Sequence, residues 1–238
     1  MMFVVQVFLI CVALICLVWV VFPYCIKRYS IQKLRNKCAK YGLLCLTYDD
    51  GPSHQVTIPI VELLDSYKVK ATFYVLGNKL QSNKEVLSQI VEKGHAVGCH
   101  SYQHRNAWKS NPISVLIDIQ KGVQSLGEHG LRPLLFRPPS GKVTFGNMLQ
   151  AMFLKMKLGW WTLDSTDTWA PPSKINDIVK KVIDANGGVV LLHDHNRTEN
   201  PDRHSYVIDL TRALLDAAFK NNIKLVTHEE LLNRKLWP

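Results

Sequence analysis

Charged side chains are absent from the first 26 residues of this 238-residue chain, and Gln6 is the one strongly polar residue among them. About 20 apolar residues suffice to cross a bilayer as a helix. A cleaved secretory signal would show basic residues before a shorter apolar run, and small residues at its end. Here no lysine or arginine precedes Lys27, and Trp19, Phe22 and Tyr24 lie near the end of the run. We therefore expect residues 1–26 to form a retained transmembrane anchor rather than a signal peptide or a buried core helix.

Acidic residues are absent before Asp49, whereas the segment 27–42 is rich in basic ones. Six of them supply +6 of the formal net charge of +10: Lys27, Arg28, Lys33, Arg35, Lys37 and Lys40. We interpret 27–42 as a basic juxtamembrane linker that contacts anionic lipid headgroups or serves as a topology signal alone. The basic residues do not continue as a patch along the chain, so nucleic acid is not an expected partner.

A recognisable disulfide framework is also missing. Three of the six cysteines fall in the apolar run and three beyond it: Cys11, Cys16, Cys25, Cys38, Cys45 and Cys99. Positively charged flanks of a membrane span tend to stay in the cytoplasm. Both observations favour a domain on the cytoplasmic side, and neither decides the face of the membrane.

Short apolar runs alternate with amphipathic stretches over residues 43–238, which we take as one catalytic domain. This alternation predicts an α/β fold, with a parallel sheet and helices packed outside it. Seven strands are expected, at 43–48, 69–76, 95–99, 134–137, 158–163, 189–192 and 223–226. Helices are expected near 57–67, 78–93, 113–128, 145–156, 173–185 and 206–221, with Gly94 and Gly130 at C-caps. So many strands favour a (β/α) barrel, complete or distorted.

Ionisable residues interrupt the apolar runs where five of the seven predicted strands end. In a (β/α) barrel the chemistry gathers at the carboxyl ends of the strands. The residues at these ends would therefore meet at one rim: Asp49, Asp50, His100, Arg137, Asp164 and His193.

A metal site is the first chemistry that these residues predict. His100 and His104 lie four apart, so that on a helical turn they would share one face and bind one cation. Asp50 adds a carboxylate at the same rim. Two imidazoles and one carboxylate leave an open coordination position, which is typical of a catalytic metal. Zinc is the first expectation, and cobalt, iron, nickel or manganese would also fit these ligands.

Hydrolysis at such a metal still needs a base for the attacking water and an acid for the departing group. Asp49 adjoins the ligand Asp50 and is the candidate base. His193 ends an apolar strand across the rim and is the candidate acid. Asp164 could orient and charge His193, and Arg137 could pair with Asp49; either residue could instead belong to an ordinary ion pair.

In this order, the segments resemble the motifs of the polysaccharide deacetylase family, the NodB-homology domain, over roughly residues 43–234. Five motifs carry the resemblance: Thr47-Tyr48-Asp49-Asp50-Gly51-Pro52, His100-Ser101-Tyr102-Gln103-His104, Phe136-Arg137-Pro138-Pro139-Ser140-Gly141, Asp164-Ser165-Thr166-Asp167-Thr168-Trp169 and Leu191-Leu192-His193. The resemblance implies a distorted barrel with seven strands.

The same resemblance implies roles for single residues. Asp49 would be the base, Arg137 would steady it, and His193 would be the acid. Leu191 would line the pocket for the acetyl methyl group. Ser140 replaces the family's usual tyrosine and retains the backbone N–H that helps an oxyanion. Trp169, expected on the groove wall, stands one residue later than is usual.

The expected function is metal-dependent hydrolysis of the N-acetyl group of an amino sugar, either polymeric or linked to a membrane lipid. Two alternatives are open. The same site could cleave O-acetyl esters of a polysaccharide, or the barrel could bind carbohydrate without catalysis. A basic segment beside a span favours a lipid-linked sugar if the domain is cytoplasmic, whereas an extracellular domain would suit peptidoglycan or a chitin-like polymer.

Overall fold

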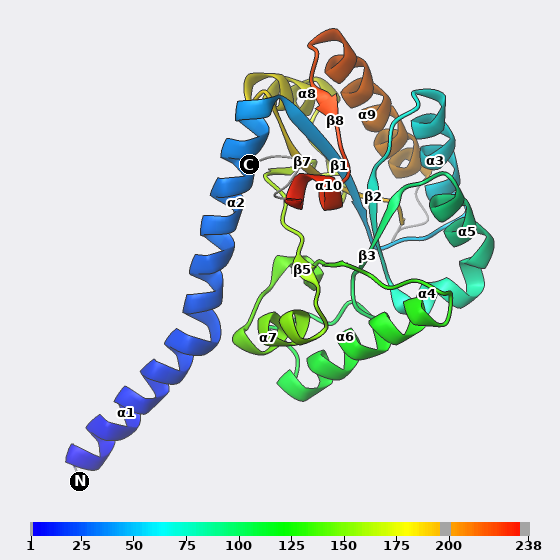
Figure 1. The fold of residues 1–238 in the computed structure, drawn as a ribbon. Helices are drawn as coiled ribbons and strands as arrows, with labels where there is room; N and C mark the ends of the chain where they lie inside the picture. The colour runs from blue at the N-terminus through cyan, green and yellow to red at the C-terminus, as the bar shows by residue number, and fades with distance from the viewer. Residues whose placement is uncertain (1, 196–200, 234–238) are drawn as a thin grey trace.

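A long N-terminal helix projects from an α/β body in the computed structural model, which describes residues 2–195 and 201–233 (Figure 1). Three stretches make up this helix: α1 (Met2–Cys16), the π-helical turn η1 (Leu17–Val21) and α2 (Phe22–Tyr41). Of the described residues, Met2–Tyr41 form the one helix long and apolar enough to cross a membrane, judged by length and composition. The helix ends at Gly42, whose left-handed φ of 59° glycine adopts without strain.

The segment predicted as a linker is helical and packs on the body. Leu34 and Cys38 are 6% and 1% exposed. They share a small core cluster with Trp160 and Val189, and Ile31 packs against it. Ile31, Leu34 and Cys38 recur at helical spacing and form one apolar stripe. The basic residues on the other faces dominate the composition of the segment, so this stripe is not apparent from composition alone.

Within residues 2–195 and 201–233, eight strands form one parallel sheet, so the predicted α/β fold is confirmed. They are β1 (Leu43–Asp49), β2 (Thr72–Val75), β3 (Ala96–Cys99), β4 (Leu135–Phe136), β5 (Lys157–Leu158), β6 (Leu163–Asp164), β7 (Gly187–His193) and β8 (Lys224–Leu225). Their order is β5-β4-β3-β2-β1-β7-β6, and β8 lies beside the start of β1. Every residue of β1 is buried, and β1 pairs along its whole length with β7.

The strand predicted at 158–163 is instead two short strands at opposite edges of the sheet. β5 pairs with β4, whereas β6 pairs with β7. Between them the chain crosses from one edge to the other. The N–H of Gly159 donates to Phe136 O over 2.8 Å, and the N–H of Thr162 donates to Val189 O over 2.9 Å. An apolar run that closes a curled sheet looks the same in sequence as a buried strand, which explains the error.

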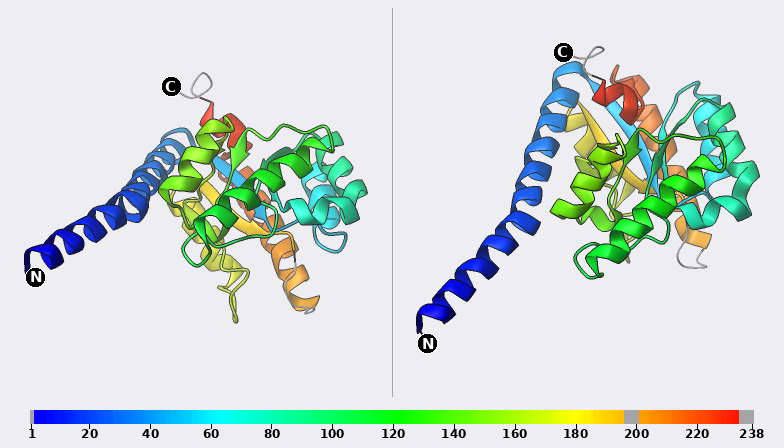
Figure 2. Two further views of the ribbon diagram at one scale, coloured as in Figure 1. Left: turned by 90° about the horizontal axis from the view of Figure 1, so that it is seen from below. Right: turned by 60° about the horizontal axis from the view of Figure 1, so that its bottom comes forward.

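Helices cover the outside of the sheet (Figure 2). They are α3 (Thr57–Ser66), α4 (Gly77–Leu80), α5 (Lys84–Glu92), α6 (Pro112–Gly127), α7 (Phe145–Phe153), α8 (Ile175–Asp184), α9 (Pro201–Lys220) and α10 (His228–Leu232), with 3-10 turns η2 (Gln81–Asn83) and η3 (Pro139–Gly141). The main core lies between these helices and the sheet and includes Ile60, Ile90 and Leu214. Gly94 and Gly130 adopt φ of 76° and 74°, as predicted for caps.

Helix α6 supports the segment that carries the two predicted histidine ligands. Asp118 accepts through its backbone O from Tyr102 N at 3.1 Å and through its side chain from Gln103 N at 3.0 Å. One glycine of the helix allows this close approach. A Cβ placed on Gly122 would lie 2.6 Å from the backbone carbon of Ser101, closer than packed atoms come.

Gly122→Ala should therefore displace the 100–104 segment and weaken metal binding. The matched control is Gly127→Ala on the same helix, where an added Cβ meets nothing within 4 Å. The control should be neutral or stabilising by up to about 1 kcal/mol, because alanine is the better helix former. Zinc titration and thermal unfolding of both full-length variants test this. Equal zinc affinity in the two variants would contradict it.

Candidate active site

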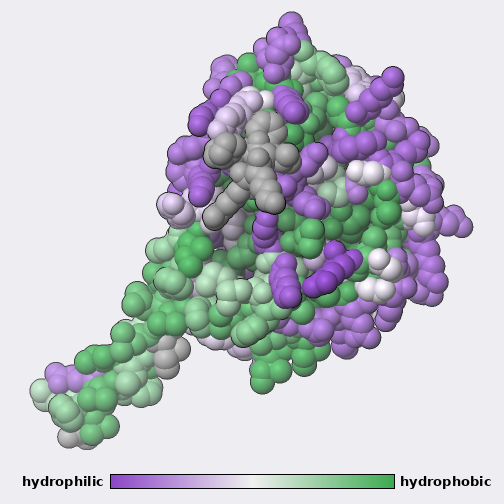
Figure 3. All heavy atoms as spheres, viewed as in Figure 1, coloured by the Kyte–Doolittle hydropathy of each residue, from purple (hydrophilic) through white to green (hydrophobic). Residues whose placement is uncertain are grey.

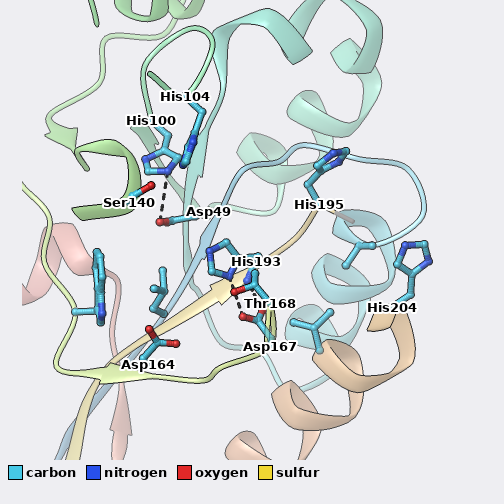
Figure 4. A pocket seen from close by; sticks show the side chains of 14 residues that line it. Asp49, His100, His104, Ser140, Asp164, Asp167, Thr168, His193, His195 and His204 are labelled. Carbon is cyan, nitrogen blue, oxygen red and sulfur yellow. Dashed lines mark hydrogen bonds and ion pairs between the residues drawn. The ribbon is translucent and has the colours of Figure 1, made fainter. Parts of the chain in front are cut away.

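A cavity of 430 Å³ lies at the carboxyl ends of the strands, where the rim residues were expected to meet (Figure 4). Its lining contains seven of the predicted site residues: Asp49, His100, His104, Ser140, Asp164, Leu191 and His193. The lining also contains residues that the sequence interpretation did not assign: Val56, Trp161, Asp167, Thr168, His195, His204 and Val207.

The three predicted metal ligands form one cluster. Asp50, His100 and His104 each offer a ligand atom, and these atoms all lie within 4.8 Å of one another. His100 Nε2 and His104 Nε2 are 3.6 Å and 3.4 Å from Asp50 Oδ1. The side chains of His100 and Asp50 are each 2% exposed and that of His104 is 19% exposed, so the cluster opens on the cavity through His104.

The segment that carries the histidines is irregular, not the helical turn expected from their spacing. Ser101 and His104 adopt left-handed φ of 71° and 59°. These turns bring the two rings within 5.0 Å of each other, measured between centroids. The i, i+4 spacing thus produced the right pairing through a different backbone.

The geometry of this cluster fits a divalent metal. His100 Nδ1 lies 2.7 Å from the backbone O of Arg137. Since a carbonyl only accepts, Nδ1 carries the proton and donates it, which leaves the lone pair of Nε2 directed at the cluster. Two imidazoles and a carboxylate are ligands that zinc, cobalt, iron, nickel and manganese all accept.

Asp49 lies beside the cluster and is tied to a buried arginine, as predicted. Arg137, which is 0% exposed, donates from Nη1 to Asp49 Oδ1 over 2.7 Å. The other oxygen, Asp49 Oδ2, lies 3.6 Å from His100 Nε2. Arg137 also donates to Thr47 Oγ1 and to Gly159 O. One carboxylate oxygen is thereby fixed, while the other faces the cavity and the cluster of Asp50, His100 and His104.

The carboxylate that pairs with His193 is that of Asp167, not that of the predicted Asp164. His193 Nδ1 lies 2.8 Å from Asp167 Oδ1, and its backbone N–H donates to Asp167 Oδ2 over 2.7 Å. Asp164 is exposed and accepts from the N–H of Thr166 in a local turn. Both aspartates belong to one motif, and only the turn between them decides which carboxylate reaches the histidine.

The electrostatics around His193 favour its protonated form. Burial disfavours the charged imidazolium, but the attraction and hydrogen bond of Asp167 outweigh burial, and Asp49 and Asp50 add to them. The pKa of His193 is thereby raised from 6.5 to about 9. His193 can therefore carry a proton at neutral pH.

The wall of the cavity is partly as predicted. Leu191 and Ser140 line it. Trp169 does not: it is 61% exposed, and Trp161 lines the cavity in its place. Trp161 follows the buried Trp160 at the crossing between β5 and β6, where the sequence interpretation placed a strand. The late position of Trp169 in its motif was the available signal that it lies elsewhere.

The N-terminal helix reaches the back of this wall. Lys27 Nζ donates to Gly141 O over 2.7 Å and lies 5.3 Å from the centre of the Trp161 ring. Gly141 adjoins Ser140, which adopts a left-handed φ of 54°. A residue of the predicted linker thus supports the cavity wall.

The turn after Asp50 is held by a buried aspartate that the sequence interpretation did not assign. Asp194 is 1% exposed and accepts from the hydroxyl of Thr57 over 2.6 Å. Burial raises the pKa of Asp194 to about 7. A Cβ on Gly51 would overlap this carboxylate, which explains the glycine.

Asp167→Asn should lower the pKa of His193 towards 6.5, whereas the matched variant Asp164→Asn should leave it near 9. Histidine titration by NMR on metal-free protein measures this. Because the folded pKa lies above the ordinary 6.5, the pair adds stability that is fully present below pH 6.5 and lost as pH rises through 9. The Tm difference between Asp167→Asn and the parent should therefore shrink over this range. An unchanged His193 pKa in Asp167→Asn would contradict the assignment.

Comparison with known proteins agrees with the motifs. The chain matches the polysaccharide deacetylase family profile over residues 36–154. It is 33% identical to a peptidoglycan-N-acetylglucosamine deacetylase of Bacillus cereus, over 81% of this chain and 89% of that one. It is 32% identical to the peptidoglycan-N-acetylglucosamine deacetylase PgdA of Listeria monocytogenes, over 81% of this chain but only 39% of that enzyme.

A solved structure extends the likeness to the fold. The structure of the peptidoglycan deacetylase PdaC from Bacillus subtilis superposes with a TM-score of 0.67 at 28% identity, over 81% of this chain and 92% of that one. Family profile, sequence identity and fold agree. The chain therefore belongs to the polysaccharide deacetylase family and is a hydrolase, a carbohydrate N-deacetylase.

Proposed function

We propose that the chain is a membrane-anchored, metal-dependent enzyme that hydrolyses the N-acetyl group of an amino sugar in a cell-envelope glycan or a lipid-linked sugar. The observation that carries the proposal is the placement of Asp49. One of its oxygens is held by Arg137 at 2.7 Å, and the other faces His100 at 3.6 Å. Figure 4 shows Asp49 between the histidine pair and His193.

Asp50, His100 and His104 would hold the metal, zinc or another of the divalent ions that accept these ligands. A bound metal supplies polarisation of the acetamide carbonyl and a lowered pKa for the attacking water. The remaining steps fall to residues of the chain.

Asp49 takes a proton from the water while the oxygen of the water forms a bond to the acetyl carbon. Ser140, at the rim of the cavity, offers its backbone N–H to the oxygen that becomes negative. His193 enters protonated and gives its proton to the nitrogen as the C–N bond breaks. Acetate and the free amino sugar leave. The proton on Asp49 and the second proton of the water pass to solvent, from which His193 regains its own proton. Leu191 closes the cavity against the methyl group of the acetyl.

The N-terminal helix supports anchoring by a single span. Its apolar part is long enough to cross a bilayer, and the basic residues that follow favour a cytoplasmic domain. Lys27 and Lys37 also contact the body, through Gly141 O and Leu231 O, so part of this charge has a structural use. The names of the Bacillus and Listeria relatives support a cell-envelope glycan as the substrate.

Asp49→Asn should abolish acetate release while zinc content is retained, because asparagine cannot take the proton yet fills the same space. Asp50→Asn is the informative comparison and should lose both zinc and activity. The full chain in detergent is the right sample, since α2 packs on the body. A loss of at least about 100-fold in turnover is expected for removal of a general base. Turnover within a few-fold of the parent in Asp49→Asn would refute the role of Asp49.

Chelation followed by reloading should abolish and then restore acetate release. A substrate panel then separates the alternatives: N-acetylglucosamine oligomers, peptidoglycan, an O-acetylated xylan and a polyprenyl-phosphate N-acetyl-hexosamine. We expect release from the amides. Release from the xylan alone would identify an esterase. Failure to bind any metal would favour a carbohydrate-binding barrel.

A further inference from the structure

The direction of the chain turns the cavity back towards α1, the uncharged first part of the N-terminal helix. Helix α2 runs away from α1, the chain turns at Gly42, and β1 runs back beside it (Figures 1 and 2). All strand pairs are parallel, so the carboxyl ends of the sheet, where the cavity lies, share the direction of β1. If α1 crosses a membrane, the cavity is on the side of the body that faces it.

Two helices of the body are held at the level where the apolar helix would leave the bilayer. Counting about 20 residues for a span places its boundary near η1. There a Cβ on Gly146 of α7 would lie 2.9 Å from the ring of Trp19 and 3.8 Å from Leu116 of α6. Phe22 and Phe145 also meet, with ring centroids 6.4 Å apart. The starts of α6 and α7 are therefore packed at the boundary itself.

Exposed apolar side chains gather on these two helices. We name as the apolar end Ile113, Ile117, Met152 and Phe153, which are 68%, 50%, 62% and 77% exposed. Phe153 and Ile113 are the most exposed large hydrophobic residues of the described body beyond Gly42. Figure 3 shows hydrophobic residues running from the N-terminal helix onto the lower end of the molecule, over α6 and α7.

The exposed charges on the segments that carry the apolar end are of one sign, because Asp118, which follows Ile117, is 3% exposed and pairs with Arg105. Residues 105–117 and 142–157 contain no aspartate or glutamate. They contain five basic residues: Arg105, Lys109, Lys142, Lys155 and Lys157. Exposed apolar side chains flanked by lysines are the pattern of a surface that lies in the headgroup region of an anionic bilayer. Trp108, partly exposed under the ammonium of Lys142, suits the same depth.

We propose that the apolar end inserts into the headgroup region of the membrane that α1 crosses. The body then lies on the bilayer, with its cavity turned to the membrane surface. Its substrate is an N-acetylated amino sugar that a membrane lipid carries or that lies against the membrane. The proposal rests on the anchoring proposed above.

Photo-crosslinking to lipid tests this in the full chain, reconstituted in phosphatidylethanolamine–phosphatidylglycerol vesicles. Three phenylalanines are replaced one at a time by p-benzoylphenylalanine: Phe8 of α1, Phe153 of the apolar end and Phe219 of α9. Phe219 is a matched control, because it is 55% exposed and lies on a different helix from the apolar end. Each is exposed, so none of the substitutions should impair folding.

Lipid adducts at position 153 should come within about threefold of those at position 8 and exceed those at position 219 by about tenfold. Adducts at position 8 with none above the control at position 153 would leave the anchor intact and overturn the docking. No adducts at position 8 would overturn the anchor and the docking together. Acetate release by the parent protein is measured separately. If the parent releases acetate, a failure of the docking or of the anchor leaves the catalytic proposal intact.

Discussion

The buried contact between Arg137 and Asp49 is the interaction on which the rest of the site depends. A fully buried guanidinium is costly unless it is paired and hydrogen-bonded. Arg137 meets this requirement through Nε and Nη1, with Asp49, Thr47 and Gly159, whereas Nη2 has no hydrogen-bond partner among the described residues. Its guanidinium lies 4.1 Å from the centre of the Tyr74 ring. Its backbone O also fixes the tautomer of His100. One residue thereby orients the proposed base Asp49 and the proposed metal ligand His100, and binds the crossing that curls the sheet.

Sequence alone predicted the residues that end strands, because parallel strands deliver their ends to one rim whatever the details of packing. Asp49, His100 and His193 lie where this argument placed them. It could not choose between Asp164 and Asp167, because a turn of three residues decides which carboxylate reaches His193. Trp161 was missed for a different reason: it lies on a crossing between β5 and β6, which hydrophobic pattern alone does not distinguish from a strand.

The N-terminal helix was the least predictable part of the fold. Composition divides the chain after residue 26, where charge begins, yet the helix continues to Tyr41 and packs on the sheet through a stripe hidden among basic residues. The contact of Lys27 with Gly141 then makes the helix a support of the cavity wall. The N-terminal helix and the body are in this sense one structure, so a membrane span formed by α1 would fix the orientation of the site.

The most direct measurement is an anomalous difference map at the zinc edge from crystals of the full chain grown with zinc. The account predicts one peak bonded at about 2.0–2.2 Å to Asp50, His100 Nε2 and His104 Nε2, with Asp49 uncoordinated and still paired with Arg137. A peak that takes Asp49 as a ligand, or no peak at these three residues, would contradict it.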